Sequence, residues 1–407
     1  MNSSGDGEPW RRNERVVVTS VMLHAAAMAA ATPIIPLFVQ DLGAASLASA
    51  ALWSGLALTA SPFFAAILAP VWGLLADRYG LKPMVQRAQL ASSLALLGMA
   101  AVWNVQQLLA LRVGLGILGG YGAMSVALVA ASVPQQETGA AIGRLQAGRI
   151  AGLGIGPLVG GLVVAGLGER AVFVASALLS TLNFGLITWL YDEPAVARKV
   201  SGAGTPSHFS FRSAGRIPNY IAVLVILFLV RFSERSLDPI IPLAVTNTLG
   251  EGPAVPVLAG AILSLGTFAS ALSSHFGGHL LSQYQPRRLL LGSLAGGAIC
   301  ALFLALAHSV VGLGAWRLGL GLLAGGAQTL AYGIASLTMP AEGRASAYGL
   351  LSSGALLGGA LAPLFAGLLT VFGLQAAFLL SAGLYLMAEM ATLVGVDRVE
   401  TLAHRAA

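Results

Sequence analysis

The sequence predicts an all-α polytopic membrane protein in which twelve transmembrane helices form two pseudo-symmetric six-helix bundles. Three observations lead to this fold class: a composition poor in charge, apolar blocks of bilayer-spanning length, and an internal repeat. Charged residues make up 9% of the 407 residues and hydrophobic residues 57%, whereas a soluble protein has about 25% charged residues. So few charges cannot cover a soluble fold of this size. The long apolar blocks also exclude a disordered chain.

Twelve stretches are long and apolar enough to cross a bilayer, which takes about 20 residues per helix. Several are longer, and the excess permits tilt. The first stretch follows a polar segment with Arg11, Arg12 and Arg15 and has no convincing cleavage site, so we expect it to be retained as a span. The predicted spans are 16–40, 50–75, 83–102, 106–133, 138–166, 170–191, 218–245, 254–281, 288–307, 309–338, 343–371 and 374–396.

One connection between spans is much longer than the others. Residues 192–217 are rich in Pro, Gly, Ser and basic residues, and they divide the spans six and six. We therefore expect an N-terminal bundle over 1–191, a cytoplasmic linker over 192–217 and a C-terminal bundle over 218–407. The single cysteine, Cys300, lies in an apolar block and leaves no intramolecular disulfide possible.

Positive charge predicts the orientation of the spans, because Lys and Arg gather on the cytoplasmic side of membrane proteins. With the N-terminus inside, cytoplasmic segments hold 16 of the 22 Lys and Arg, and external loops hold one, Arg170. The other five lie within or at the ends of spans: Arg112, Arg149, Arg231, Arg235 and Arg317. We therefore expect a cytoplasmic (inner) membrane protein with both termini in the cytoplasm. The net charge of +6 then reflects topology, and no nucleic-acid partner is expected.

The two halves of the sequence repeat each other at an offset of 205 or 206 residues. Four matches keep this register: Pro33–Pro36 with Pro239–Pro242, Arg112 with Arg317, Glu137 with Glu342, and Pro157 with Pro363. Both halves begin inside, so they are parallel repeats related by an axis along the membrane normal. Transporters with such halves bind substrate at the midplane between them and rock one half against the other. A static membrane protein with an old duplication is the alternative.

A charged turn follows the second predicted span, with the sequence Gly73-Leu-Leu-Ala-Asp77-Arg78-Tyr-Gly80-Leu-Lys82-Pro. We expect Gly73 to allow close helix approach and Gly80 to permit the turn. Asp77 can accept hydrogen bonds from a neighbouring helix N-terminus or an arginine, which makes a contact that forms and breaks. The alternative is a solvated basic turn that only sets topology.

This turn resembles the loop signature G-x-x-x-D-R-x-G-R-K of the Major Facilitator Superfamily, whose members have twelve helices in two six-helix bundles. The resemblance implies a cytoplasmic gate formed by Gly73, Asp77, Arg78, Gly80 and Lys82. Leu81 stands where the family usually has Arg, and this weakens one arm of the charge network. In the second half, the counterpart around Gly278 and Arg287 has Ser282 in place of Asp, so we expect the gate to be asymmetric.

Two further motifs resemble those of exporters in this superfamily, specifically its drug:proton antiporters. The fifth span carries the G-P-x-x-G-G pattern as Gly156, Pro157, Gly160 and Gly161, preceded one helical turn earlier by Gly152. Small residues on one face let helices pack closely, and Pro157 is expected to bend the helix. Arg112, followed by Gly116 in the fourth span, resembles the signature whose arginine is implicated in proton coupling. Generic glycine-rich packing is the alternative for the fifth span.

The seventh span carries four charges, each of which is costly inside a membrane. Arg231, Glu234, Arg235 and Asp238 fall on one helical stripe and sum to zero charge. They must face the protein interior, either paired or in contact with water. One hypothesis is an ion-pair ladder that only shapes the helix. The other places Glu234 and Asp238 on a central cavity, as proton carriers or as counter-charges for the substrate. Arg231 and Arg235 would then tune the pKa values of the two carboxylates.

Other polar residues in the spans are candidates for the substrate cavity: His24, Gln328 and Tyr332, with the two arginines of the seventh span. His24 can titrate near neutral pH, although a lone histidine is more often structural. His275 and His279 have metal-ligand spacing but no evident third ligand, so no metal is expected. The usual multidrug pattern has acidic residues in the first span, which this sequence lacks, and arginines would suit an anionic or zwitterionic substrate.

The sequence contains no phosphate-binding loop, no nucleophile–base pair and no soluble domain, so we expect neither an enzyme nor a cofactor. The energy source must then be an ion gradient, and the acidic residues favour protons over sodium. We expect a monomeric, proton-coupled exporter of small amphipathic compounds that works by alternating access, with Arg112, Glu234 and Asp238 in coupling. The alternatives are a dedicated exporter of one metabolite, metallophore or lipid-like compound, and a non-transporting receptor or scaffold.

Overall fold

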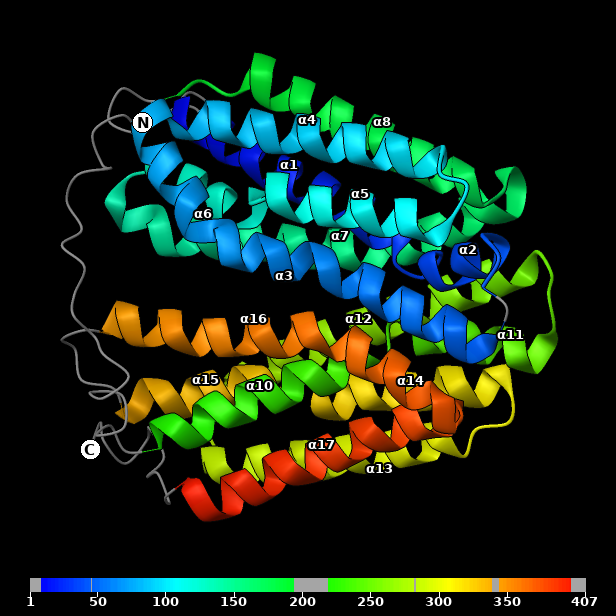
Figure 1. Ribbon diagram of the computed structural model, residues 1–407. Coiled ribbons are helices and arrows are strands. Elements are labelled where there is room, and N and C mark those ends of the chain that lie inside the picture. Colours follow the sequence, from blue (N-terminus) through cyan, green and yellow to red (C-terminus); the bar gives the residue numbers. More distant parts are fainter. Residues whose placement is uncertain (1–8, 45, 194–218, 282, 339–343, 397–407) are drawn as a thin grey trace, which may run out of the picture. The chain divides into compact units, whose positions relative to one another are not determined.

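The computed structural model describes residues 9–44, 46–193, 219–281, 283–338 and 344–396, and these residues form helices and turns without a strand (Figure 1). The sequence up to the long connection forms α1 (Pro9–Ala31), α2 (Ile35–Asp41), α3 (Leu47–Tyr79), α4 (Leu81–Ala100), α5 (Val105–Leu118), α6 (Tyr121–Ser132), η1 (Gln135–Glu137), α7 (Thr138–Leu167) and α8 (Glu169–Leu190). The remainder forms α10 (Tyr220–Ser236), α11 (Ile240–Leu249), α12 (Ala254–Leu280), α13 (Pro286–Ala305), α14 (Val310–Ala324), α15 (Ala327–Thr338), α16 (Arg344–Leu369), η3 (Thr370–Phe372) and α17 (Leu374–Gly395).

Each of the twelve predicted spans falls on one helix or on two consecutive helices. Nine helical stretches in the described ranges are long and apolar enough to cross a membrane by length and composition. The other three predicted spans fall on α4, on α5 with α6, and on α10 with α11. The α4 helix carries Lys82, Arg87 and two glutamines, α5 and α6 are separate short helices, and the stretch of α10 and α11 contains four charges.

Helix breaks occur at related positions of the two sequence halves. The Pro-Ile-Ile-Pro motif separates α1 from α2, and its repeat separates α10 from α11 at Asp238-Pro239. A second pair of breaks was not predicted: Gly119-Gly120 ends α5 before α6, and Gly325-Gly326 ends α14 before α15. Gly120 has a φ of 97°, which favours glycine.

The described contacts divide the chain into two compact units. Unit 1 comprises Met1–Ile34 and Ala60–Thr205, and unit 2 comprises Ile35–Thr59 and Pro206–Ala407. The α2 helix and the first part of α3 thus belong to unit 2, where α2 contacts α11. The bundle boundaries expected at residues 191 and 218 remain a prediction, because residues 194–218 lie outside the described ranges.

Unit 1 is built around a glycine seam between α7 and α1. A Cβ atom added at Gly156 would lie 2.6 Å from the carbonyl oxygen of Ala26, and additions at Gly152 and Gly160 would overlap the carbonyls of Met22 and Ala30. The fifth-span glycines therefore allow the two backbones to touch, as their spacing predicts. Pro157 lies inside α7, which remains one helix from Thr138 to Leu167.

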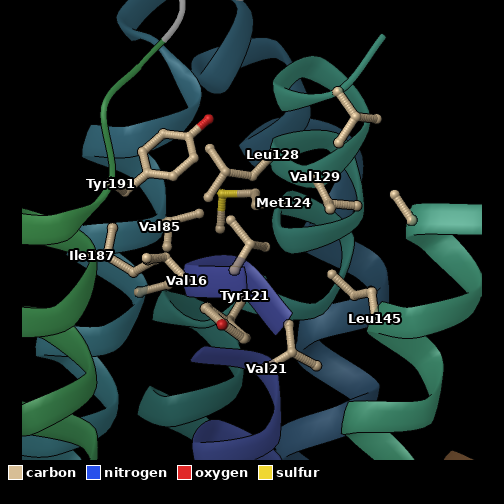
Figure 2. Packing of buried hydrophobic residues seen from close by; sticks show 14 residues of the cluster. Val16, Val21, Val85, Tyr121, Met124, Leu128, Val129, Leu145, Ile187 and Tyr191 are labelled. Atoms are coloured by element: carbon tan, nitrogen blue, oxygen red, sulfur yellow. The ribbon is translucent and has the colours of Figure 1, made fainter. Parts of the chain in front are cut away.

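Beside this seam, buried apolar side chains fill the space between α1, α4, α6, α7 and α8. Figure 2 shows Val16 and Val21 of α1 packed against Tyr121 and Met124 of α6, with Tyr191 at one end of the cluster. Between helices in a membrane, such side chains stabilise the bundle through van der Waals packing, because lipid tails are as apolar as they are. The cluster holds together the helices that carry the polar groups of unit 1.

Unit 2 repeats the seam between α16 and α10. A Cβ atom at Gly354 would lie 2.6 Å from a methyl carbon of Leu224, and one at Gly358 would overlap the carbonyl of Phe228. A further close contact joins the start of α3 to α16, where a Cβ atom at Gly55 would overlap the carbonyl of Pro363. Glycine spacing thus fixes the closest helix pairs in both units.

Candidate functional site

The charged turn predicted as a cytoplasmic gate lies in unit 1, between α3 and α4. Gly80 has a φ of 96°, which confirms that this turn needs glycine. The Lys82 ammonium donates hydrogen bonds to the carbonyls of Thr188 (3.1 Å) and Tyr191 (2.6 Å) at the end of α8. The Lys82 backbone N–H donates to Glu193 at 3.3 Å. A cation at a helix C-terminus is electrostatically favourable, so Lys82 ties the turn to the end of α8.

Gly73 and Arg78 are less engaged than Gly80 and Lys82. A Cβ atom added at Gly73 would meet no described atom within 4 Å, so the close helix approach expected there is absent among the described residues. Arg78 is exposed, and its guanidinium lies 5.4 Å from the ring centre of Tyr79. The side chain of Asp77 lies outside the described part of the structure, as does Ser282 of the second-half counterpart. The gate contact of Asp77 stays a prediction.

A cation–π pair, which the sequence analysis missed, holds the break between α5 and α6. The guanidinium of Arg87 lies 3.4 Å from the ring centre of Trp72. Trp72 donates its indole N–H to the carbonyl of Ile117 at 2.9 Å, and Arg87 donates to the carbonyl of Gly119 at 2.8 Å. These carbonyls end α5 and lack helical partners there, so α3 and α4 together cap the broken helix.

The equivalent break in unit 2 is held by serines. Ser274 donates to the carbonyl of Gly325 at 2.9 Å, and the Gly326 N–H donates to Ser273 at 3.0 Å. Ser293, which the repeat aligns with Arg87, donates to the carbonyl of Leu323 at 2.7 Å. The two units therefore share a helix break but cap it with different groups. Unit 1 uses a charged guanidinium and an indole, whereas unit 2 uses neutral serine hydroxyls.

Arg112 lies on α5 in unit 1 with 7% of its surface exposed. Its backbone carbonyl accepts a hydrogen bond from Ser61 at 2.7 Å, and a Cβ atom at Gly116 would lie 2.6 Å from the Ser61 carbonyl. The Arg112 Nε has no hydrogen-bond partner in the described structure. The residue is thus a buried positive charge held by close packing of α5 on α3.

His24 belongs to a polar network inside unit 1. Its ring lies 4.1 Å from that of Tyr121, and its Nδ1 is 3.3 Å from the side-chain oxygen of Gln89. The Tyr121 hydroxyl is 2.5 Å from that of Ser20, and Asn183 donates to the Ser20 carbonyl at 2.9 Å. Four helices, α1, α4, α6 and α8, therefore meet at hydrogen-bonded side chains of which the sequence analysis had singled out His24.

The four charges of the seventh predicted span, three on α10 and Asp238 just beyond its end, form two ion pairs in unit 2. Arg231 contacts Glu234 at 3.0 Å and Arg235 contacts Asp238 at 2.9 Å, each three residues apart. The carboxylate side chains are 17% and 16% exposed. The stems of both arginines lie against Gly359 of α16, where a Cβ atom would be 3.3 Å and 3.5 Å from their Cγ atoms. This charge ladder, Arg231, Glu234, Arg235 and Asp238, is therefore fully paired and half-buried, and its arginine stems pack against Gly359.

The other cavity candidates lie on α15 in unit 2. Tyr332 is half-buried and donates to Ser352 at 3.3 Å, with the ring of Tyr348 at 6.1 Å. Gln328 is half-buried one turn before Tyr332 on the same helix. His24 and Arg112 are in unit 1, whereas the ladder, Gln328 and Tyr332 are in unit 2. The structure thus groups the predicted residues within each unit, and a shared cavity stays a prediction.

Comparison with known proteins places these features in a family. The sequence-family model described as the Major Facilitator Superfamily matches this chain twice, over residues 17–224 and over residues 223–406. The chain belongs to the Major Facilitator Superfamily. The double match coincides with the sequence repeat, and it confirms the predicted all-α fold of twelve spans in two six-helix bundles. This member of the superfamily is a multi-pass membrane transporter.

Curated bacterial relatives are similar over most of the chain. The multidrug resistance protein MdtG of Yersinia enterocolitica is 32% identical over 79% of this chain and 77% of its own length. The multi-drug resistance efflux pump PmrA of Streptococcus pneumoniae is 33% identical over 77% of this chain and 78% of its own. MdtG of Klebsiella pneumoniae is 29% identical over 95% of this chain and 94% of its own.

Solved structures with low sequence identity share the fold of this superfamily member. A bacterial homologue of the human lysosomal transporter Spinster matches with a TM-score of 0.78 and 15% identity over 96% of this chain and 97% of its own. The human organic anion transporter MFSD10 matches with a TM-score of 0.67 and 17% identity over 95% of this chain and its whole resolved length. At these identities the likeness supports the fold alone.

Proposed function

We propose that this transporter exports small amphipathic compounds in exchange for protons, by alternating access across the cytoplasmic (inner) membrane. The observation that carries the proposal is the paired charge ladder of α10, in a chain about one third identical to two proteins named as multidrug efflux or resistance proteins. The expected topology places both termini in the cytoplasm, and the expected state is a monomer.

In this proposal, Glu234 and Asp238 carry the protons. Each carboxylate is held by an arginine three residues earlier, so protonation removes the charge that binds Arg231 or Arg235. An intramembrane arginine released from its partner must find water or another acceptor, because an unpaired charge there is costly. Protonation is thereby coupled to a change in what the arginines contact, and this change is the two-state element that alternating access requires.

The gate and the remaining candidates have defined tasks in the same proposal. Lys82 keeps the charged turn fixed to α8 within unit 1, which leaves Asp77 and Arg78 for a contact that opens and closes. Arg112 tunes proton coupling from unit 1. His24, Gln328 and Tyr332 supply polar contacts to substrate.

Export of one dedicated metabolite is the second candidate, favoured by Arg231 and Arg235. Their guanidinium groups would complement a carboxylate or phosphate on a single anionic or zwitterionic compound, rather than a range of cationic drugs.

Transport by purified protein in liposomes tests the proposal. We expect an imposed pH gradient to drive ethidium accumulation in wild-type vesicles, and the double variant Glu234→Gln, Asp238→Asn to abolish that gradient-driven component. The matched control is Glu251→Gln, which removes an exposed carboxylate between α11 and α12 and should transport as wild type does.

Three other outcomes would redirect the proposal. Gradient-driven transport that survives in the double variant would remove the ladder from coupling. Proton release without dye movement would favour the dedicated exporter. Vesicles that move neither protons nor any tested solute would support a receptor or scaffold.

A further inference from the structure

Unit 2 buries two donor groups for which the described residues supply no hydrogen-bond acceptor, the Arg317 Nε and the Tyr385 hydroxyl. Arg317 of α14 is 7% exposed, and Tyr385 of α17 is fully buried. The Arg317 Nε and the Tyr385 hydroxyl make no hydrogen bond within the described structure. The four charges from Arg231 to Asp238 are paired with each other, and neither pair includes Arg317. A buried donor without an acceptor is destabilising, and a buried arginine without a counter-charge is more so.

Glycines fix the positions of both side chains. A Cβ atom added at Gly266 of α12 would lie 2.5 Å from the Arg317 Cζ, so the guanidinium rests directly on the α12 backbone. A Cβ atom added at Gly297 of α13 would lie 3.0 Å from two ring carbons of Tyr385. Four helices therefore build the cluster. The two donors are held by packing against backbone, which is the kind of preorganisation that a binding site requires.

The surroundings of the cluster are rich in donors and carry a net positive charge. Tyr385 is close enough to Arg317, Glu234 and Cys300 for electrostatic interaction with each, and its hydroxyl lies near that of Ser233, which already pairs with Ser381 at 2.5 Å. The Glu234 carboxylate is already bound by Arg231 at 3.0 Å, and the buried Cys300 thiol is a weak donor. A guanidinium, a hydroxyl and a thiol thus lie within electrostatic range of Tyr385 or belong to it, and no ion pair among the described residues includes Arg317.

We propose that Arg317 and Tyr385 bind a small anionic group inside unit 2, either a halide ion or a single carboxylate. Both ligands accept charge-assisted hydrogen bonds, and both supply the missing negative charge. A halide would be a bound ion independent of transport. A carboxylate would belong to the exported compound, and that version rests on the proposed function.

Thermal unfolding of the purified protein in detergent tests the site without transport. Chloride or benzoate is added as the potassium salt against potassium methanesulfonate, at constant ionic strength and pH. A ligand that binds the folded state raises the unfolding midpoint in a saturable way. We expect one of the two anions to do so for wild type. Arg317→Gln should lose the response, and Tyr385→Phe should weaken the apparent affinity by about tenfold.

Two matched variants separate the site from general effects of charge or aromatic content. Arg287→Gln removes an arginine of α13 that donates to the Leu393 carbonyl, and Tyr191→Phe removes a buried hydroxyl that already pairs with Ser132 in unit 1. Both should keep the wild-type anion response. If Arg317→Gln does not fold, the anion response of the nearly isosteric Tyr385→Phe variant still shows whether the Tyr385 hydroxyl contributes to anion binding.

The outcomes identify the ligand or reject the site. A response to chloride alone assigns a halide site, and a response to benzoate alone assigns a carboxylate subsite. If neither anion distinguishes wild type from Tyr385→Phe and Arg317→Gln, the inference is overturned, and water occupies the donors instead. Because binding is measured in detergent, a failure of dye transport would sink the proposed export and leave this result standing.

Discussion

Single missing Cβ atoms decide which helices of this transporter touch. Gly152, Gly156 and Gly160 recur every four residues on α7, and each lies against a backbone carbonyl of α1. In a membrane, close packing replaces the hydrophobic effect as the force between helices, so a single methyl group matters. The sequence motif could be predicted to form such a seam because its period matches one face of a helix.

Substitution of Gly152 by Ala tests the seam. The added Cβ atom would overlap the Met22 carbonyl and lie 2.9 Å from the Ala25 Cβ, so we expect a loss of about 1–3 kcal/mol from overpacking. Gly166→Ala on the same helix is the control, because its Cβ atom would meet nothing within 4 Å. The unfolding midpoint in detergent should fall for the first variant and stay unchanged for the second. Equal midpoints would show that α1 and α7 do not pack this closely.

The ion pair of Arg231 with Glu234 can be measured by a double-mutant cycle. Glu234→Gln alone leaves Arg231 without a partner in a half-buried position, whereas Arg231→Gln with Glu234→Gln leaves no charge. We therefore expect the double variant to be more stable than the sum of the single losses by about 1 kcal/mol. The free energy of unfolding by denaturant gives the coupling. Strict additivity would mean that the pair contributes only through each side chain separately.

At the scale of elements, the fourth and tenth spans are each two helices rather than one. Hydropathy predicted single spans over 106–133 and 309–338, because the glycines at the breaks are apolar enough to pass as helix interior. The breaks persist since other helices cap them: Trp72 and Arg87 in unit 1, and serines of α12 and α13 in unit 2. Contacts between residues 30 or more positions apart leave no local signal in the sequence.

Hydrogen exchange at the α5–α6 junction tests the cation–π cap. Arg87→Gln removes the stacked guanidinium that donates to the Gly119 carbonyl, a contribution of about 1 kcal/mol. We expect amides around residues 117–121 to exchange about fivefold faster than in wild type. Amides around Gly325 and Gly326 in unit 2 serve as the internal reference and should not change. An unchanged junction would assign the break to the glycines alone.

At the scale of the whole molecule, the span count, the repeat and the family could be predicted from hydropathy, charge bias and motifs. The pairing of the α10 charges also follows from spacing, because residues three apart share a helix face. Other features could not be predicted. His24 is joined to Gln89 by a hydrogen bond and to Tyr121 by a ring contact, and these residues come from three separate helices. The assignment of residues 35–59 to unit 2 depends on packing against α11 and α16.

The orientation of the whole protein is tested by cysteine labelling, which the single native cysteine makes practical. In a Cys300→Ala background, a cysteine replaces exposed Ala101 or exposed Gln283. The positive-charge bias predicts that a membrane-impermeant maleimide labels Ala101→Cys in intact cells and Gln283→Cys only after permeabilisation. Labelling with the opposite pattern would invert the predicted topology, and labelling of both in intact cells would refute the span count between them.

Because α3 is divided between the two compact units, the protein cannot be split at the long connection into two polypeptides that each hold one complete unit. A break in the coding sequence within 192–217 would give two polypeptides of six predicted spans each. The first would carry Ile35–Thr59, a segment whose packing partners, including Pro363 and the residues of α11, are encoded by the second. Neither fragment alone contains a finished unit 2. If the two halves are translated separately, they can form a functional protein only when Ile35–Thr59 of the first polypeptide packs into unit 2 of the second, as a domain-swapped element does.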